Sequence, residues 1–198
     1  MTFSASAPGF ANAATIPVIN GLSDSCHPCQ LLADVQTMQE RFGDVRNLRV
    51  TWIGDGNNVC HSYLEAANIF EFNLTVAVPS SYKPAPEWVE KANGRVTFID
   101  SPEEAVKGAQ VVTTDVWTSM GQENEIKDRL RAFNGYQITP ALLDSAAKDV
   151  CFLHCLPAHK GEEISENLFA DSRTNSVWAQ AGNRLHAQKA LLEHLIKG

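Results

Sequence analysis

Short apolar runs alternate with segments whose apolar residues recur at helical spacing along most of the chain. The runs predict strands over 48–53, 74–78, 96–99, 110–114, 150–153 and 176–179. The helical spacing predicts helices at 31–42, 59–70, 87–92, 122–133 and 183–196, with a further helix opening at Thr139-Pro140. Strands that alternate with helices in this way predict an α/β domain with a mostly parallel, Rossmann-like sheet flanked by helices.

Several helix ends carry their own signals. Ser101-Pro102-Glu103-Glu104 predicts a capping box with proline at the first helical position. Asp24 or Ser25 is the candidate cap of the first helix, and Gly43 is its predicted stop. Periodicity is weak before residue 15, so we expect a poorly ordered stretch over 1–14, one α/β domain over 15–182 and a terminal helix over 183–198.

Composition and charge narrow the class of protein. Hydrophobic residues at 44% and charged residues at 20% are ordinary for a soluble globular chain. A net charge of −7 without a basic stripe argues against nucleic-acid binding, and no apolar run approaches the roughly 18 to 20 residues of a membrane span. The five scattered cysteines do not form a secreted disulfide framework, and Met1–Ala14 is a poor signal peptide, so we expect a reducing cytoplasm.

Ligands of parallel sheets bind outside the carboxyl ends of the strands, so the loops there are the first places to look for chemistry. Gly54-Asp55-Gly56-Asn57-Asn58 follows one predicted strand; it lacks the third glycine of a dinucleotide fingerprint and equally fits a plain turn with an Asn cap. Asp115 and the turn Ser119-Met120-Gly121 follow another strand. They suit the ammonium group of an amino acid, although a capped loop that packs Trp117 on the core is an alternative.

Three further groups have both functional and simpler interpretations. Cys155 lies at the carboxyl end of a predicted strand. A cysteine there can be a nucleophile, a metal ligand or an inert buried thiol. Arg184 at the start of the terminal helix suits a carbonyl or phosphate oxygen, or is a solvated charge. Cys26-His27-Pro28-Cys29 before a helix is typical of a thiol oxidoreductase. A zinc site that adds His27, His154, Cys155 and His159 to these cysteines is disfavoured. Only one Cys-x-x-Cys is present, and Cys151-x-x-x-Cys155 lacks zinc-knuckle spacing.

Together, the order of these motifs resembles the ornithine carbamoyltransferase family. The resemblance covers the chain from about Ala11 and is carried by the lead-in 17–24, His27–Asp34, Trp52–Val59, Asp115–Gly121, His154–Pro157 and Asn183–Lys189. The Ser-Met-Gly turn distinguishes the ornithine enzymes from the aspartate and acetylornithine enzymes. The oxidoreductase interpretation loses weight, because Cys29 falls inside the family's His-Pro-x-Gln motif.

The resemblance implies carbamoyl transfer from carbamoyl phosphate to the δ-amine of L-ornithine in arginine metabolism, giving citrulline and phosphate without a metal or organic cofactor. It implies that ornithine is held by Asn58, Asp115, Ser119 and Met120. It implies that carbamoyl phosphate is contacted by His27, Gln30, Cys155, Leu156 and Arg184. The catalytic set is then Cys155, Asp115, His27 and Arg184, with Cys155 close to the δ-amine and not a covalent nucleophile.

The family also has an N-terminal domain with a Ser-x-Arg-Thr phosphate loop, which we do not find in these residues. Ser172-Arg173-Thr174 lies too late in the chain to be that loop. We therefore expect a truncated or split enzyme that is inactive alone and needs the missing domain in trans. The resemblance implies a homotrimer for the family, whose contacts come largely from that domain. The terminal helix would lose its packing partner, leaving an apolar stripe at Leu185, Ala190 or Leu191, and Leu195 exposed or self-associated.

Gly182 stands where the family usually has an acidic residue, which affects the expected placement of Arg184. A non-catalytic amino-acid-binding module is the alternative function.

Overall fold

A computed structural model describes residues 7–118 and 125–197. Five parallel strands form one sheet in the order β3-β2-β1-β4-β5. Their bounds are β1 (Arg49–Ile53), β2 (Asn73–Ala77), β3 (Val96–Phe98), β4 (Val111–Thr114) and β5 (Cys151–His154). The predicted α/β fold with a parallel sheet is confirmed, and five of the six predicted strands are present.

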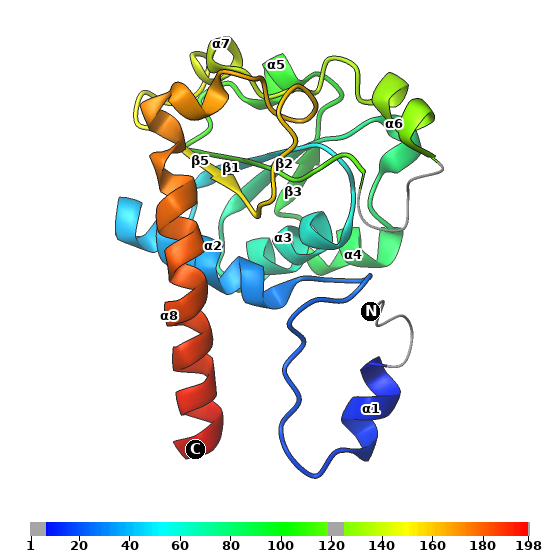
Figure 1. Cartoon of the computed structure of the whole chain (residues 1–198), viewed down its shortest axis with the longest axis vertical. Helices are drawn as coiled ribbons and strands as arrows, with labels where there is room; N and C mark the ends of the chain where they lie inside the picture. Colours follow the sequence, from blue (N-terminus) through cyan, green and yellow to red (C-terminus); the bar gives the residue numbers. More distant parts are fainter. Residues whose placement is uncertain (1–6, 119–124, 198) are drawn as a thin grey trace.

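Helices cover both faces of the sheet (Figure 1). One face carries α2 (Pro28–Phe42), α3 (Asn58–Ile69) and α4 (Pro86–Lys91), and the other carries α5 (Pro102–Ala105) and α7 (Pro140–Leu143). Helix α8 (Asn175–Lys197) lies beside β5 and α2. The remaining elements are α1 (Ala7–Ala13), α6 (Ile126–Ala132) and the 3-10 turns η1 (Ser80–Tyr82), η3 (Leu168–Ala170) and η4 (Ser172–Thr174). Helix α1 falls within the stretch that was expected to be poorly ordered.

The central strands are almost entirely buried because both faces of the sheet are covered. Val50 and Trp52 of β1 point into the core beneath α2 and α3, whereas Ile53 points into the core beneath α5 and α7. All four residues of β4 and all four of β5 are buried. The sheet therefore separates two apolar cores and brings the carboxyl ends of its central strands to one edge.

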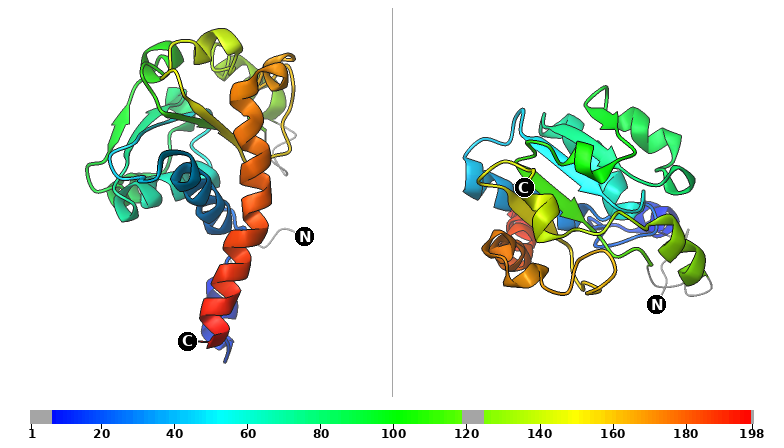
Figure 2. Two further views of the ribbon diagram at one scale, coloured as in Figure 1. Left: turned by 90° about the vertical axis from the view of Figure 1, so that its left-hand side faces the viewer. Right: turned by 90° about the horizontal axis from the view of Figure 1, so that it is seen from above.

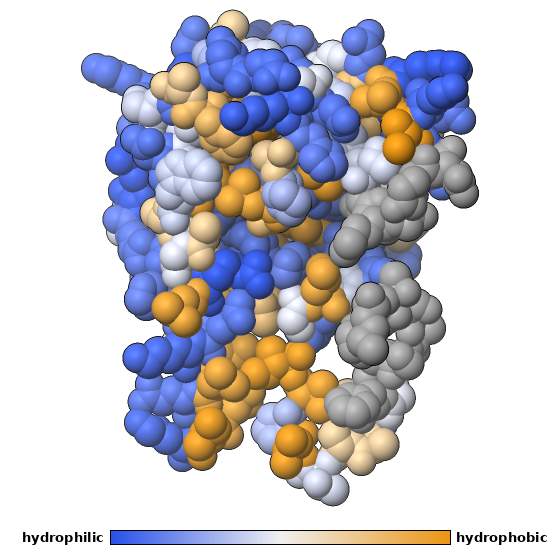
Figure 3. All heavy atoms as spheres, viewed as in Figure 1, coloured by the Kyte–Doolittle hydropathy of each residue, from blue (hydrophilic) through white to orange (hydrophobic). Residues whose placement is uncertain are grey.

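Helix α8 is longer than predicted and replaces the last predicted strand. It begins at Asn175, so the strand expected over 176–179 is wrong. The Ser176 hydroxyl donates to the Phe152 carbonyl of β5 over 2.6 Å, and Val177 is fully buried, which fixes this first turn against the sheet as helix. Figure 2 shows that the second half of α8 extends beyond the body of the domain. Leu185 is 69% exposed there and Leu195 37%, while Leu191 is partly buried. Figure 3 shows apolar residues gathered at the lower part of the molecule, where this half of α8 lies.

The helix starts follow the sequence signals in part. Ser101 accepts a hydrogen bond from the Glu104 amide, as its capping role predicts, and Gly43 ends α2 with a φ of 79°. The predicted cap of α2 at Asp24 or Ser25 is wrong, because His27 occupies the N-cap and Pro28 the first helical position. In the described part of the chain, no helix combines the length and the apolar character needed to cross a membrane.

Candidate functional site

The strand order places a switch point between β1 and β4. The chain leaves β1 toward β2 and leaves β4 toward β5 on the other side, so the two connections diverge at the carboxyl ends of β1 and β4. In sheets of this kind, ligands bind at that point. Asn57 follows β1 and Asp115 follows β4. The Asn57 amide donates to Asp115 Oδ2 over 2.7 Å, while its carbonyl oxygen accepts from the amides of Val59 and Cys60 at the start of α3. The cap of α3 therefore also orients the Asp115 carboxylate.

Asp115 joins a third strand through Cys155. The carboxylate is buried, and its Oδ1 accepts from the Cys155 thiol over 2.9 Å and from the Val116 amide over 2.8 Å. Burial, together with the adjacent Asp115 charge, raises the pKa of the Cys155 thiol well above its usual value. The thiol is consequently a neutral hydrogen-bond donor at this site, which fits the expectation that it is not a covalent nucleophile.

His27, Gln30 and Arg184 meet where α2 begins and α8 passes. Arg184 donates to the Gln30 side-chain oxygen over 2.5 Å. Burial, and next the positive charge of Arg184, lower the pKa of His27, and the charge of Asp115 opposes them. His27 is thus a neutral imidazole whose buried Nδ1 has no protein partner. Arg184 lies within α8 rather than at its start, so the expectation of a helix N-terminal arginine is wrong.

A buried polar network behind these residues was not predicted. Asp34 of α2 accepts hydrogen bonds from Gln30 (2.8 Å), Tyr63 (2.6 Å) and Gln180 (2.5 Å). Burial raises the pKa of Asp34, and these three hydrogen bonds oppose the shift. Because the donors come from α2, α3 and α8, the network fixes Gln30 and, through it, Arg184. Its sequence signal was an acid, Asp34, at helical spacing from the apolar core residues Leu31 and Met38.

A buried ion pair supports the loop after β4. Arg129 donates to Asp55, and its Nε donates to the Trp117 carbonyl over 2.6 Å. Its guanidinium lies 4.6 Å from the centre of the Tyr82 ring. Burial raises the pKa of Asp55 to about 6, against the opposing charge of Arg129. Arg129 therefore anchors the segment that leads directly into Ser119 and Met120.

Comparison with known proteins identifies the family. Residues 46–195 match the family model described as aspartate/ornithine carbamoyltransferase, Asp/Orn binding domain, and residues 2–40 match the model of its carbamoyl-P binding domain. The chain belongs to the aspartate/ornithine carbamoyltransferase family. The second match corrects the expectation that the carbamoyl-phosphate domain is wholly absent, because residues 2–40 match part of it.

The carbamoyltransferase relatives are longer than this chain. It is 58% identical to "Ornithine carbamoyltransferase 1, anabolic" of Pseudomonas savastanoi pv. phaseolicola, over 94% of this chain and 61% of the relative. It is 58% identical to the anabolic ornithine carbamoyltransferase of Pseudomonas aeruginosa, over 95% and 61%. The crystal structure of the Thermus thermophilus ornithine carbamoyltransferase superposes with a TM-score of 0.86 at 44% identity, over 95% of this chain and 62% of that one. The structure of the Pyrococcus furiosus ornithine carbamoyltransferase superposes with a TM-score of 0.88 at 42% identity, over 96% of this chain and 63% of that one.

The other predicted site residues within the described part of the structure form no hydrogen bond with Asp115 or Arg184. Asn58 turns its amide to the Ser23 carbonyl (2.7 Å), and it is the unpredicted neighbour Asn57 that reaches Asp115. Leu156 has a φ of 56°, and its amide donates to His154 Nδ1 over 2.9 Å. Ser119 and Met120 lie outside the described residues.

The two cysteines of the alternative redox site differ in their surroundings. Cys26 and Cys29 are both free, and Cys29 is buried. Burial raises the pKa of the Cys29 thiol.

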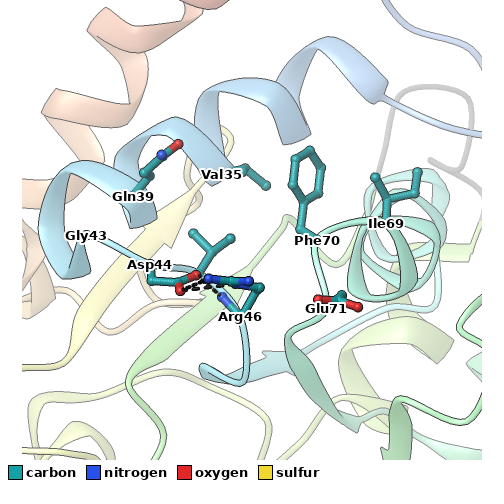
Figure 4. A pocket seen from close by; sticks show the side chains of 9 residues that line it. Val35, Gln39, Gly43, Asp44, Arg46, Ile69, Phe70 and Glu71 are labelled. Atoms are coloured by element: carbon teal, nitrogen blue, oxygen red, sulfur yellow. Dashed lines mark hydrogen bonds and ion pairs between the residues drawn. The ribbon is translucent and has the colours of Figure 1, made fainter.

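Two cavities lie at the opposite, amino-terminal edge of the sheet. One, of about 280 Å³, opens between the ends of α2 and α3 beside the Asp44–Arg46 ion pair (Figure 4). The other, of about 540 Å³, lies between α2, the start of α8 and the segment before β5. Neither is lined by a predicted site residue, so the candidate site is the polar cluster at the carboxyl ends of β1, β4 and β5.

Proposed function

We propose that this chain provides the ornithine site of an ornithine carbamoyltransferase, which moves the carbamoyl group of carbamoyl phosphate to the δ-amine of L-ornithine. Citrulline and phosphate are the products. The observation that carries this proposal is the buried Asp115 carboxylate at the switch point, held by the Asn57 amide and the Cys155 thiol. A fixed carboxylate of this kind suits the α-ammonium group of an amino acid. The free state of all five cysteines supports a cytoplasmic location.

The state of Cys155 fits a reaction in which a neutral amine attacks. A thiolate beside the δ-amine would keep that amine protonated and unreactive, whereas the neutral thiol accompanies it without adding negative charge. Cys155 then orients the amine toward the carbamoyl carbon, and orientation of two substrates is a large part of the acceleration.

The opposite side of the site suits the carbamoyl group. As the amine attacks, negative charge develops on the carbamoyl oxygen, and prepositioned donors lower the barrier most. We assign that role to Arg184, which Gln30 holds in place, and to the neutral imidazole of His27. Ser119 and Met120 are proposed to complete the ornithine site.

Departure of phosphate requires further donors. The 198 residues contain no Ser-x-Arg-Thr loop in the position that the family uses. We therefore expect this chain to bind ornithine without forming citrulline, and to form citrulline once a separately produced carbamoyl-phosphate-binding domain of a close relative is added.

Isothermal titration with L-ornithine tests the proposed site. Asp115→Asn keeps the shape of the side chain but removes its charge, and we expect it to weaken ornithine binding at least about tenfold, as for loss of about 1.4 kcal/mol. Asp149→Asn is the matched control, because Asp149 is an exposed acid before β5, at the other edge of the sheet. Equal ornithine affinity in wild type and Asp115→Asn would overturn the assignment of Asp115.

Citrulline is assayed in the same samples, with and without the added domain. Binding that is never followed by citrulline, even with the domain and carbamoyl phosphate present, would instead favour a non-catalytic amino-acid-binding module.

A further inference from the structure

A second group of ligating side chains lies in the loop after Cys155 and takes no part in the proposed reaction. His159, Glu162 and Glu163 offer one imidazole nitrogen and two carboxylate oxygens, all within 4.8 Å of one another. His159 Nδ1 already lies 3.6 Å from Glu162 Oε2. The loop is tightly folded, because the Gly161 amide donates to the Ile164 carbonyl over 2.7 Å.

Glu163 is the buried member, and half of its carboxylate is unsatisfied. Its side chain is 0% exposed. Oε1 accepts from the His159 amide over 2.6 Å and is paired with His154 Nε2 over 3.1 Å. Oε2 is also buried but has no hydrogen-bond partner. A buried carboxylate oxygen without a partner is costly, and an unsatisfied one in a native fold calls for an explanation such as a bound ion.

The neighbouring histidine reaches only one of the two carboxylate oxygens of Glu163. The Leu156 amide donates to His154 Nδ1 over 2.9 Å, so Nε2 is the ring nitrogen left to donate. His154 Nε2 is directed at Glu163 Oε1 and leaves Oε2 without a partner. Among the described residues, no lysine or arginine forms an ion pair with Glu163. The Glu163 carboxylate therefore accepts hydrogen bonds through Oε1 but not through Oε2, and neither oxygen is paired with a lysine or an arginine of the described residues.

We propose that His159, Glu162 and Glu163 bind one divalent transition-metal ion, with Zn²⁺ as the ion that suits them best. Bonds of about 2.1 Å would bring the ligand atoms to about 3.4 Å from one another in a tetrahedral site. The side chains of His159 and Glu162 are 46% and 37% exposed, so they are free to close that distance around the fixed Glu163. One imidazole with two carboxylates favours Zn²⁺ over Ca²⁺ or Mg²⁺, which prefer oxygen ligands throughout.

The bound ion would tie the exposed turn to the buried His154–Glu163 pair, next to Cys155 in the chain. A fourth position, for water, would stay open, as is usual with three protein ligands. This site is independent of the proposed carbamoyl transfer, because none of its three ligands belongs to the ornithine or carbamoyl group of residues.

The test is titration of the 198-residue chain with Zn²⁺ after removal of metals by a chelator. We expect one ion per chain and a higher melting temperature with Zn²⁺ present, since the ion binds the folded state. His159→Ala and Glu162→Gln should each weaken Zn²⁺ binding about tenfold or more. Glu166→Gln is the matched control and should bind as wild type, because Glu166 is exposed in the same loop but outside the cluster. Glu163→Gln is avoided, since it alters a buried pair and would confuse binding with folding.

Co²⁺ titration separates this site from a cysteine site. Thiolate ligands give Co²⁺ an intense charge-transfer absorption, which we expect to be absent, and Cys155→Ser should retain metal binding. Three results would overturn the proposal: no stoichiometric binding, binding that survives both His159→Ala and Glu162→Gln, or binding that shows the thiolate band and is lost in Cys155→Ser. Melting temperatures of the metal-free variants establish that each is folded.

Discussion

Gln180 joins α8 to two other elements inside the protein, and its replacement gives the sharpest stability prediction. Its amide nitrogen donates to Asp34 of α2 over 2.5 Å, and its amide oxygen accepts from the His154 amide of β5 over 3.0 Å. The side chain is 1% exposed, so water does not replace these contacts. Gln180→Ala removes both hydrogen bonds at once and leaves a space behind.

The expected magnitude follows from the two groups that lose a partner. The His154 amide becomes a buried donor without an acceptor, which costs about 1–3 kcal/mol. Asp34 keeps two of its three donors, and the lost hydrogen bond to an acidic group is worth about 1.5–3 kcal/mol. Allowing for partial relaxation, we expect Gln180→Ala to lower the free energy of unfolding by about 3–4 kcal/mol, a large part of the usual 5–15 kcal/mol.

Gln180→Glu adds a pH signature to the same position. The introduced carboxyl group would face Asp34, and two adjacent carboxylates share a proton, which raises their joint pKa in the folded state. A pKa raised on folding gives stability that is present at low pH and is lost as the pH rises through the folded pKa. Gln180→Glu should therefore be closest to wild type near about pH 4 and fall further below it toward about pH 8.

Urea unfolding, followed by tryptophan fluorescence across this pH range, measures both variants. Gln39→Ala on the exposed face of α2 is the control and should change the free energy of unfolding by less than about 0.5 kcal/mol. A loss below about 1 kcal/mol for Gln180→Ala, or a pH-independent loss for Gln180→Glu, would refute the argument from unsatisfied buried groups.

Three further changes test other parts of the fold by the same unfolding measurement. Gly182→Ala should stabilise the chain by about 0.5–1 kcal/mol, because Gly182 lies inside α8 and an added Cβ meets nothing within 4 Å; a loss of stability would contradict this. Gly56→Ala should destabilise by about 1–3 kcal/mol and weaken ornithine binding, because its Cβ would lie 2.5 Å from the Tyr82 carbonyl oxygen. Arg129→Met should cost about 3–5 kcal/mol by leaving Asp55 buried without its cation, and Asp55→Asn in the same chain should recover part of that loss.

The fold was largely predictable because the central strands are buried on both faces and so appear as short runs of apolar and β-branched residues between helical segments. The strand expected over 176–179 was wrong because such a short run does not by itself distinguish a strand from a buried helical turn. Ser-Val-Trp-Ala has strand-like composition, but only tertiary contact decides its form: Ser176 bonds the Phe152 carbonyl, and Val177 enters the core. The cap of α2 was misassigned although Pro28 marked the true start, because proline at the first helical position makes His27 the N-cap.

The sequence predicted most residues of the candidate site, but it did not predict which of them form hydrogen bonds with one another. Motif order pointed to Asp115 and Cys155, and the structure brings them within hydrogen-bonding distance. Which of Asn57 and Asn58 faces Asp115 depends on where α3 begins, and sequence patterns fix helix ends only to within one or two residues. Arg129 lies in the helix predicted over 122–133, and its role was not predicted. Its partner Asp55 lies far away in the sequence, and the burial of the pair is visible only in three dimensions.

The projection of α8 beyond the domain makes the helix a lever. At a rise of 1.5 Å per residue, Arg184 lies about 6 Å from Gln180 along the axis and Ile196 lies about 24 Å from it. A tilt about Gln180 that displaces Ile196 by about 2 Å would shift Arg184 by about 0.5 Å. Displacements of the outer end of α8 thus reach the guanidinium reduced about fourfold, so a contact that positions that end also shifts Arg184.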